Sequence, residues 1–148
     1  MTTQLRFTFG AAVGALLVAA TLASGQSFQP FRTIWSGVYT KNEAARGKEQ
    51  AAQLCSRCHG ADLKGGGAAP TLTGPAFFNR WNNLMLLDAV AYIQSAMPKE
   101  HEFFVSADTT REILAFIFQE SGIPAGSEPM SKDVKTQAAI LITRQPAK

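Results

Sequence analysis

Cysteine and histidine are scarce in this chain, which holds two of each among its 148 residues. A structural zinc site uses about four protein ligands, so a zinc site here would have to use His101 together with a carboxylate. A thioredoxin-like dithiol needs a βαβ pattern around its cysteines, and the sequence around Cys55 and Cys58 has none. The shortage of ligands therefore disfavours zinc binding, and the missing βαβ pattern disfavours dithiol redox chemistry.

Charge is almost missing from the start of the chain, where Arg6 is the only charged residue before Arg32. The 17 residues of 7–23 are mostly apolar and small, a pattern typical of a secretory signal peptide. We expect residues 1–25 to be such a signal and the mature protein to be periplasmic. An uncleaved membrane anchor is the alternative, although the apolar stretch is shorter than the roughly 20 residues that span a bilayer.

Neither sign of charge dominates, because 14 basic and 11 acidic residues give a formal net charge of +3. Loss of Arg6 with the signal leaves 13 basic against 11 acidic residues, or +2. This near balance disfavours nucleic acid as a partner. The triplet Gly65-Gly66-Gly67 lacks the Lys-Ser/Thr that completes a phosphate-binding loop, so nucleotide binding is disfavoured as well.

What the chain does have is Cys55-Ser56-Arg57-Cys58-His59, the C-x-x-C-H spacing at which a protein takes up haem covalently. Two thiols on one helical turn can each add to a vinyl group of the same porphyrin. The imidazole that follows them is placed to bind the iron from the proximal side. We therefore expect one haem c, attached through Cys55 and Cys58 and ligated by His59. Such attachment takes place outside the cytoplasm in bacteria, in agreement with export.

The sixth ligand of the iron decides between electron transfer and ligand chemistry. Met97 follows an expected helix and precedes Pro98, which stiffens the backbone, so we expect its thioether to bind the iron. His101 is the alternative protein ligand, and an open or water-bound position is the third possibility. Met85 and Met130 are expected to pack against apolar surface instead.

Apolar periodicity predicts three helices. The first has Asn42 as its N-cap and runs through Leu54, with a small inward face that allows another helix to approach closely: Ala44, Gly47 and Ala51.

Two further helices are expected after the haem motif. One carries apolar residues from Leu86 to Ile93 and must stop before Pro98. The other begins at the N-cap Ser106, carries bulky apolar residues and stops at Gly122.

The remaining segments are expected to be irregular. Residues 26–40 are expected to form an extended lead-in, and the Gly- and Pro-rich stretch from Gly60 to Phe78 is expected to be a loop. Residues 41–122 then form the haem domain, and residues 123–148 form a C-terminal tail packed on it.

Together these residues resemble class I cytochromes c over roughly residues 35–126. The shared features are a helix with a glycine, C-x-x-C-H-G, a Pro-x-Leu-x-Gly loop, a Met-Pro loop and a final helix with an inner aromatic residue. Within that class the chain is similar to the cytochrome c modules associated with pyrroloquinoline-quinone alcohol dehydrogenases. That similarity lies in Trp35-Ser36-Gly37-Val38-Tyr39-Thr40, in Ala68-Ala69-Pro70-Thr71-Leu72-Thr73-Gly74-Pro75-Ala76-Phe77, in Trp81-Asn82 and in Gly122-Ile123-Pro124-Ala125-Gly126.

The resemblance implies an all-α fold, a single small domain of class I cytochrome c type wrapped around one covalent haem c. It also implies that the Pro70 carbonyl accepts a hydrogen bond from His59, which would orient the imidazole. Trp81 would lie near a haem propionate, or would serve simply as core. Gly47 would contact Phe116 where the first and last helices cross.

Two positions depart from the pattern of these modules. Ala51 stands where an aromatic residue is usual, and Met85 stands where a Ser or Thr helix cap is usual. We therefore expect a weaker helix crossing and a weaker start of the second helix, with the iron ligands unaffected.

The function expected from these observations is that of an exported mono-haem c-type cytochrome that carries single electrons and performs no catalysis of its own. Its donor would be a periplasmic dehydrogenase, such as a quinoprotein alcohol dehydrogenase, and its acceptor a terminal oxidase or another respiratory protein. A haem enzyme or gas-binding sensor with a labile sixth ligand is the alternative. A third possibility is a subunit held by a dehydrogenase or, if the N-terminal segment is uncleaved, by the membrane.

Overall fold

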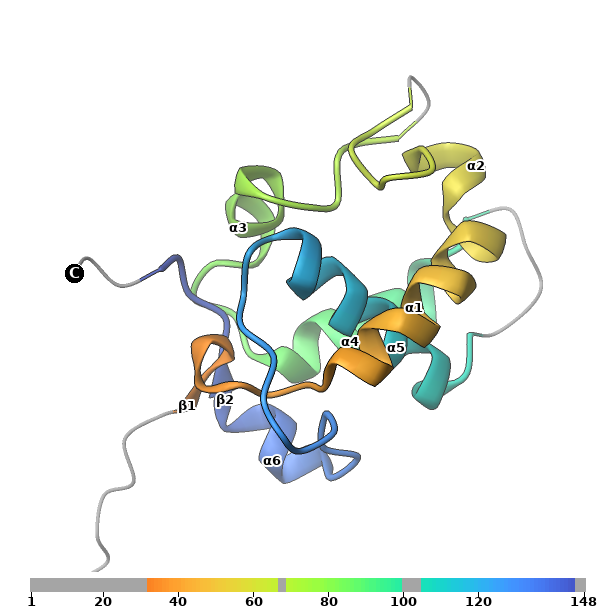
Figure 1. The fold of residues 1–148 in the computed structure, drawn as a ribbon. Coiled ribbons are helices and arrows are strands. Elements are labelled where there is room, and N and C mark those ends of the chain that lie inside the picture. The colour runs from red at the N-terminus through yellow and green to blue at the C-terminus, as the bar shows by residue number, and fades with distance from the viewer. Residues whose placement is uncertain (1–31, 67–68, 100–104, 146–148) are drawn as a thin grey trace, which may run out of the picture.

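We describe the protein from a computed structural model, which describes residues 32–66, 69–99 and 105–145. The expected signal segment 1–25 and His101 lie outside these residues. None of the described helices is long and apolar enough to cross a membrane. The elements are, in order, β1 (Arg32–Thr33), η1 (Ile34–Ser36), α1 (Lys41–Leu54), α2 (Ser56–His59), α3 (Pro75–Trp81), α4 (Leu86–Ala96), α5 (Ala107–Glu120), α6 (Val134–Ala138) and β2 (Ile140–Leu141) (Figure 1).

Helix α1 is capped by Thr40, and the prediction of Asn42 as its N-cap is wrong. The Thr40 hydroxyl accepts a hydrogen bond from the Glu43 backbone N–H at 3.2 Å. In return, the Glu43 carboxylate accepts one from the Thr40 backbone N–H at 2.9 Å. This reciprocal capping box satisfies two backbone donors that the helix cannot satisfy itself, so α1 already begins at Lys41.

Helices α1 and α5 cross closely, as the small face of α1 predicted. Ala44, Gly47 and Ala51 are all buried, and a Cβ atom at position 47 would overlap the carbonyl oxygen of Glu112. The two backbones can approach to this degree only because position 47 has no side chain. The resemblance implied a contact between Gly47 and Phe116. The atoms nearest to Gly47 instead belong to the α5 backbone at Glu112 and Ile113, about one turn before Phe116.

Helix α5 supplies the bulk that α1 lacks. Its N-cap is Ser106, as predicted, and the Ser106 hydroxyl accepts a hydrogen bond from the Thr109 backbone N–H at 3.1 Å. The helix ends at Glu120, and Gly122 follows it in the left-handed region with φ of 77°. Five of its large apolar side chains are buried in the core: Ile113, Leu114, Phe116, Ile117 and Phe118.

The stretch expected to be a loop contains a helix at its end. Helix α3 begins at Pro75, inside the 60–78 segment. Proline is favourable at the first helical position because its fixed φ is already helical and its missing N–H would have no partner there. Phe77 and Phe78 of α3 are buried, which anchors the helix to the core.

Helix α4 starts after Met85, whose backbone N–H donates to the Asp88 carboxylate at 2.8 Å. The Met85 side chain makes no capping hydrogen bond to the first turn, so the Asp88 carboxylate ties the start of the helix only to the Met85 N–H. The helix ends at Ala96, before Pro98, as expected.

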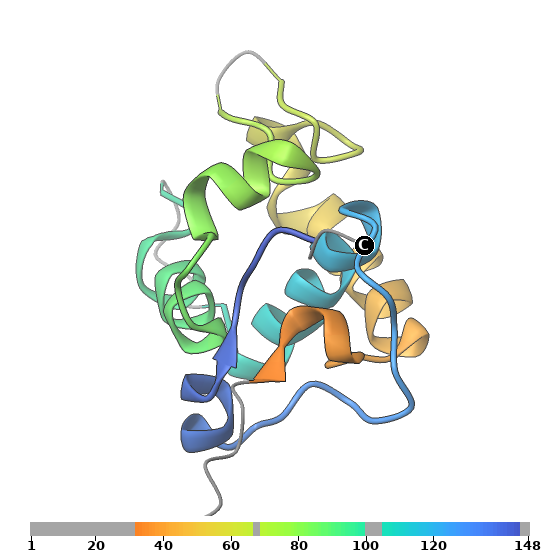
Figure 2. The ribbon, with the colours of Figure 1, turned by 90° about the vertical axis from the view of Figure 1, so that its left-hand side faces the viewer.

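The segment after α5 returns along the whole domain and meets its beginning. Strand β2 pairs in parallel with β1, with Arg32 opposite Ile140 (Figure 2). The Trp35 indole N–H donates to the Thr143 carbonyl at 2.8 Å, and the Tyr39 hydroxyl donates to the Ile123 carbonyl at 2.7 Å. The expected lead-in is therefore partly regular, and it is held against the tail by two aromatic residues.

Candidate cofactor site

The two cysteines lie where α1 ends. Cys55 is both the C-cap of α1 and the N-cap of α2. Its carbonyl accepts hydrogen bonds from the N–H groups of Cys58 at 3.2 Å and His59 at 2.9 Å. One helical turn therefore carries both thiols and the imidazole. Cys58 is exposed and Cys55 is half-buried. Burial raises the pKa of the Cys55 thiol to about 11, so this thiol is protonated at neutral pH.

The imidazole of His59 has one nitrogen already engaged. Its Nδ1 lies 2.7 Å from the carbonyl oxygen of Pro70. Because a carbonyl can only accept, Nδ1 carries a proton and donates, which leaves Nε2 as the nitrogen that can bind a metal. His59 is 8% exposed, so the hydrogen bond fixes a largely buried ring. The result is an imidazole oriented with Nε2 as its candidate ligand atom.

The Pro70 carbonyl is held in place by the loop that leads to it. The Gly65 N–H donates to the His59 carbonyl at 2.8 Å, and the Thr71 hydroxyl donates to the Lys64 carbonyl at 2.7 Å. Leu63 is fully buried and anchors the loop from inside. The acceptor for His59 is therefore fixed by the chain on both sides of it.

Met97 lies at the C-terminal end of α4, where its backbone N–H donates to the Ile93 carbonyl at 3.1 Å. Its own backbone is extended, with φ of −134° and ψ of 143°, as expected for a residue before proline. The side chain is half-buried. Met97 thus belongs to the link that follows the helix, where the sequence placed it.

The other two described methionines lie away from this link. Met130 is buried, and its backbone N–H donates to the Glu43 carboxylate at 3.0 Å. Glu43 precedes Cys55 by twelve residues of helix, or roughly 18 Å at 1.5 Å per residue. Met85 caps the opposite end of α4 from Met97. Met130 is therefore bound near the end of α1 that is remote from the haem motif, and Met85 lies at the end of α4 that is remote from Met97.

Trp81 ends α3 and packs edge-to-face on Tyr92 of α4, with ring centroids 5.5 Å apart. The guanidinium of Arg80 lies over both rings, 5.0 Å from the Trp81 centroid and 4.1 Å from the Tyr92 centroid. The position of Trp81 near a propionate stays a prediction. Sequence reasoning missed Arg80, because its contact with Tyr92 depends on how α3 and α4 pack; its only sequence signal was the adjacent tryptophan.

These residues fit a haem c. Two thiols on one turn suit two thioether bonds, the oriented imidazole suits iron, and the Met97 thioether stands at a helix end. Within 32–66, 69–99 and 105–145, no three His, Cys, Asp or Glu side chains gather closely enough to hold a bare metal ion.

A known protein family matches the part of the chain from α1 to α5. Residues 42–117, which are 76 of the 148 residues and so just over half of the chain, match the family described as "Cytochrome C oxidase, cbb3-type, subunit III". No curated protein sequence matches the chain. Among solved structures, the sulfane dehydrogenase SoxCD from Paracoccus pantotrophus is 18% identical, with a TM-score of 0.46, and the match covers 81% of this chain and 68% of that chain. Superposition at that TM-score is too loose to bear on fold or function.

Proposed function

The chain belongs to the family of cytochrome C oxidase, cbb3-type, subunit III, and from that premise we propose that it is an exported one-electron carrier between a periplasmic dehydrogenase and a respiratory acceptor. As a class I cytochrome c domain it binds haem c covalently through Cys55 and Cys58 and serves haem-based electron transfer. The carrier role, the compartment and the identity of both partners are the proposal.

The observation that carries the proposal is the hydrogen bond between His59 Nδ1 and the Pro70 carbonyl, 2.7 Å long. It gives the imidazole one ligand nitrogen and one orientation. When bound, haem supplies an iron that alternates between the ferrous and ferric states. The chain contributes the Cys55 and Cys58 thiols for attachment, the Nε2 of His59 and, in our proposal, the sulfur of Met97.

A methionine in the sixth position suits a carrier better than an enzyme. The thioether is neutral and soft, so it favours ferrous iron relative to a second imidazole and raises the reduction potential. Two protein ligands also leave no position for a substrate. Buried side chains of α5 help to exclude water from the interior, among them Ile113, Leu114 and Phe118.

Export and partners are argued from the sequence. The apolar stretch at 7–23 favours secretion, and haem attachment to C-x-x-C-H takes place outside the bacterial cytoplasm. We propose a periplasmic location, a dehydrogenase as donor, such as a quinoprotein alcohol dehydrogenase, and a terminal oxidase or another respiratory protein as acceptor. Membrane attachment would follow only from an uncleaved N-terminal segment.

The first experiment tests attachment. Acid-acetone extraction of the purified protein should leave the porphyrin with the polypeptide. Replacement of both thiols, Cys55→Ala with Cys58→Ala, should yield little holoprotein. Haem that washes out of the wild-type protein would overturn covalent binding.

The second experiment separates a carrier from a ligand-binding haem protein. Carbon monoxide added to the reduced protein at neutral pH should leave the visible spectrum unchanged if Met97 holds the sixth position. Rapid formation of a carbon monoxide complex would favour the sensor or enzyme instead. Reduction by a quinoprotein alcohol dehydrogenase, followed by oxidation by membranes that contain a terminal oxidase, would then establish the two partners.

A further inference from the structure

Two arginines lie at the C-terminal end of α3, each without a carboxylate partner in the part of the chain that the structure describes. Arg80 lies over the rings of Trp81 and Tyr92. Arg144 donates from its guanidinium to the Asn79 side chain at 2.7 Å, and its backbone N–H donates to the Asn82 side chain at 2.9 Å. Asn79 precedes Arg80 directly, so both cations lie at one helix end.

Arg144 reaches α3 because the C-terminal segment runs along the loop between α3 and α4. The Asn83 N–H donates to the Ile142 carbonyl and the Ile142 N–H donates to the Leu84 carbonyl, both at 2.8 Å. Figure 1 shows this segment passing beside α3 before the chain ends. The C-terminal segment therefore brings Arg144 to the end of α3 and adds its positive charge to that of Arg80.

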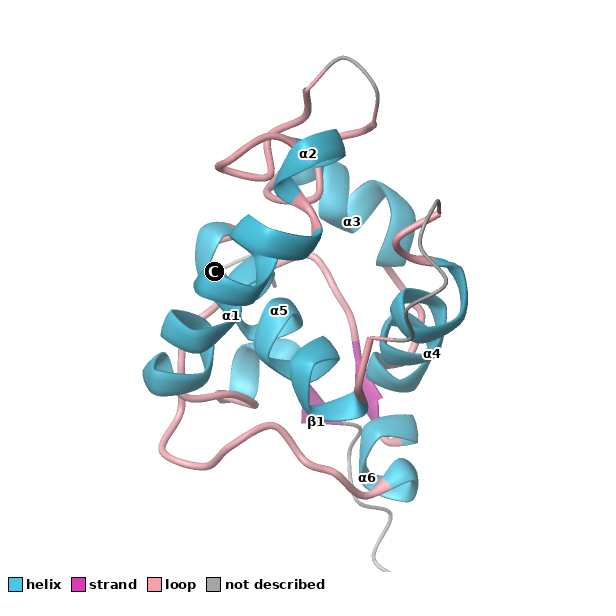
Figure 3. Cartoon of the chain, turned by 90° about the vertical axis from the view of Figure 1, so that its right-hand side faces the viewer, coloured by secondary structure: helices cyan, strands magenta, loops and turns pink. Residues whose placement is uncertain are grey.

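Haem brings two ionised propionates, and a carboxylate near a protein interior needs cations or hydrogen-bond donors. The porphyrin carries its vinyl groups and its propionates on opposite halves of the ring. Because Cys55 and Cys58 bind the vinyl half at α2, the propionate half must point away from α2. Figure 3 shows α2 at the top and α3 and α4 together along one side of the fold, so the end of α3 is a place that the far half can reach.

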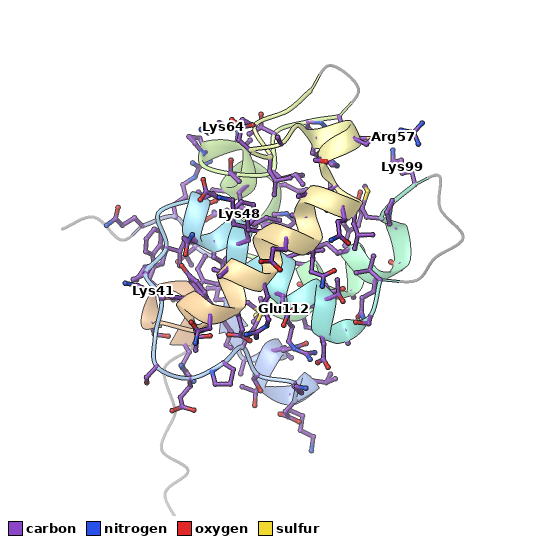
Figure 4. The ribbon with its side chains drawn as sticks, turned by 45° about the vertical axis from the view of Figure 1, so that its right-hand side comes forward. Lys41, Lys48, Arg57, Lys64, Lys99 and Glu112 are labelled. Atoms are coloured by element: carbon purple, nitrogen blue, oxygen red, sulfur yellow. The ribbon has the colours of Figure 1, made fainter. Side chains whose placement is uncertain are left out.

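We infer that Arg80, with Arg144 from the C-terminal segment, is the cationic partner of the haem propionates in this protein. The cations on the α2 side do not meet the same requirement. Arg57 stands between the two cysteines and extends outward from α2 (Figure 4), which is the vinyl half. Lys64 is paired with Asp62 at 3.5 Å. The inference requires bound haem and does not depend on the carrier role.

The test uses the purified holoprotein and four single variants. Arg80→Gln removes the charge, Arg80→Lys keeps it, and Arg144→Gln removes the second charge. Lys41→Gln is the matched control, because Lys41 is exposed at the far end of α1 (Figure 4) and also loses one positive charge. The readouts are the reduction potential, the propionate bending mode in the resonance Raman spectrum and the thermal unfolding temperature.

A cation near the propionates opposes the additional positive charge of ferric haem, so its loss favours the oxidised state. We expect Arg80→Gln to lower the equilibrium constant for reduction about threefold, or about 30 mV given 59 mV per tenfold change for one electron. The propionate mode should shift as well. Arg144→Gln should act in the same direction, while Arg80→Lys and Lys41→Gln should stay near the wild type.

Four results would contradict the inference in whole or in part. If Arg80→Gln kept the wild-type potential and propionate mode, Arg80 would not be a partner of the propionates. The same result in Arg144→Gln would show that the tail contributes no such partner. An equal shift of the reduction potential in Lys41→Gln would show that the shift comes from the change in net charge, and not from a contact with the propionates. If Arg80→Lys and Arg80→Gln lowered the reduction potential equally and also lowered the unfolding temperature, the shift would come from lost packing of the arginine side chain, and not from its charge. Because no partner enters these measurements, each result is independent of whether the protein is a carrier.

Discussion

The three described methionines occupy three different environments, so the sixth ligand can be tested residue by residue. Met97 follows α4 in an extended conformation, Met85 caps the other end of that helix, and Met130 is buried beside Glu43. Only Met97 combines partial exposure with a position after the last turn of a helix. A thioether in such a link can turn toward a cofactor without breaking helical hydrogen bonds.

We predict that Met97→Ala opens the sixth position and lowers the reduction potential, because water or His101 would replace a soft thioether. The methionine-to-iron charge-transfer band of the oxidised protein should disappear. Absorption spectroscopy and a potentiometric titration measure both effects.

The controls are the other two methionines. Met85→Leu conserves volume and should leave the spectrum unchanged. Met130→Ala empties a buried site and should cost about 2–4 kcal/mol of unfolding free energy, again with an unchanged spectrum. Disappearance of the charge-transfer band in Met130→Ala would show that the wrong methionine was chosen.

For single residues, the sequence predicted a role only where the interacting residues are close neighbours in the chain. The C-x-x-C-H motif lies within one helical turn, so its chemistry could be inferred from the sequence. Thr40 and Glu43 also carried a local signal, Thr-x-x-Glu, which is typical of a capping box and was overlooked in favour of Asn42. Arg80 and Arg144 gave no local signal beyond the tryptophan next to Arg80, because Arg144 reaches α3 only through the return of the tail.

Among the elements, the crossing of α1 and α5 depends on a single missing side chain. Gly47 lies against the backbone at Glu112, and a backbone carbonyl cannot move aside as a side chain can. The interface therefore has no room for a methyl group, although alanine would otherwise be the better helix former.

We predict that Gly47→Ala destabilises the holoprotein by up to about 2 kcal/mol. Overpacking at the crossing outweighs the roughly 1 kcal/mol that alanine gains over glycine in helix propensity. Urea unfolding followed by far-UV circular dichroism measures the difference. Ala45→Ser, at an exposed position of the same helix, should change stability by less than about 0.5–1 kcal/mol. Stability equal to the wild type in Gly47→Ala would show that the helices can separate at no cost.

Glu43 joins α1 to the tail as well as capping the helix. Its carboxylate accepts hydrogen bonds from the backbone N–H groups of Thr40 and Met130, and Glu43 is 6% exposed. Removal of this carboxylate leaves two amides without their acceptor.

We predict that Glu43→Ala lowers the unfolding free energy by about 2–3 kcal/mol, because a largely buried amide then lacks a partner. Limited proteolysis should begin within the segment around Met130 at a lower protease concentration than in the wild type. Glu49→Ala, which removes an exposed carboxylate from the same helix, is the control. Equal cleavage patterns for all three proteins would mean that this bond does not hold the tail.

The elements that sequence reasoning placed best are those with strong periodicity. Helix α5 carries a run of bulky apolar residues between Ser106 and Gly122, and its cap and end were both predicted. Helix α3 has seven residues, too few for a periodic pattern, and its glycine- and proline-rich approach favoured a loop. Its stability comes from the burial of Phe77 and Phe78, which depends on the rest of the fold.

For the molecule as a whole, net charge sets how the protein meets its partner. The formal charge is +3, or +2 without Arg6, and two haem propionates offset most of the remainder. Long-range steering is therefore weak, and docking should rely on a small apolar area around the haem edge. Lys64 and Lys99 are exposed on segments that flank the motif (Figure 4), so they would tune orientation.

We predict that the rate of reduction by a quinoprotein alcohol dehydrogenase falls by less than about tenfold between low and physiological salt, because few exposed charges are screened over a Debye length of about 8–10 Å. Stopped-flow spectroscopy across a salt series measures it. A much steeper decline would indicate a charged docking ring and a different partner. No reduction at any salt would exclude this dehydrogenase and leave the haem assignment intact.

The parallel pairing of β1 with β2 has a consequence for the order of assembly. It joins segments 108 positions apart, and a contact across so long a stretch of chain pays a large loop-closure entropy and forms late in folding. If the chain is exported N-terminus first, as proposed, residues 55–59 reach the periplasm before Ile140 does. The haem motif therefore emerges well before the tail can dock, which leaves time for cofactor loading on a chain whose final strand is still free.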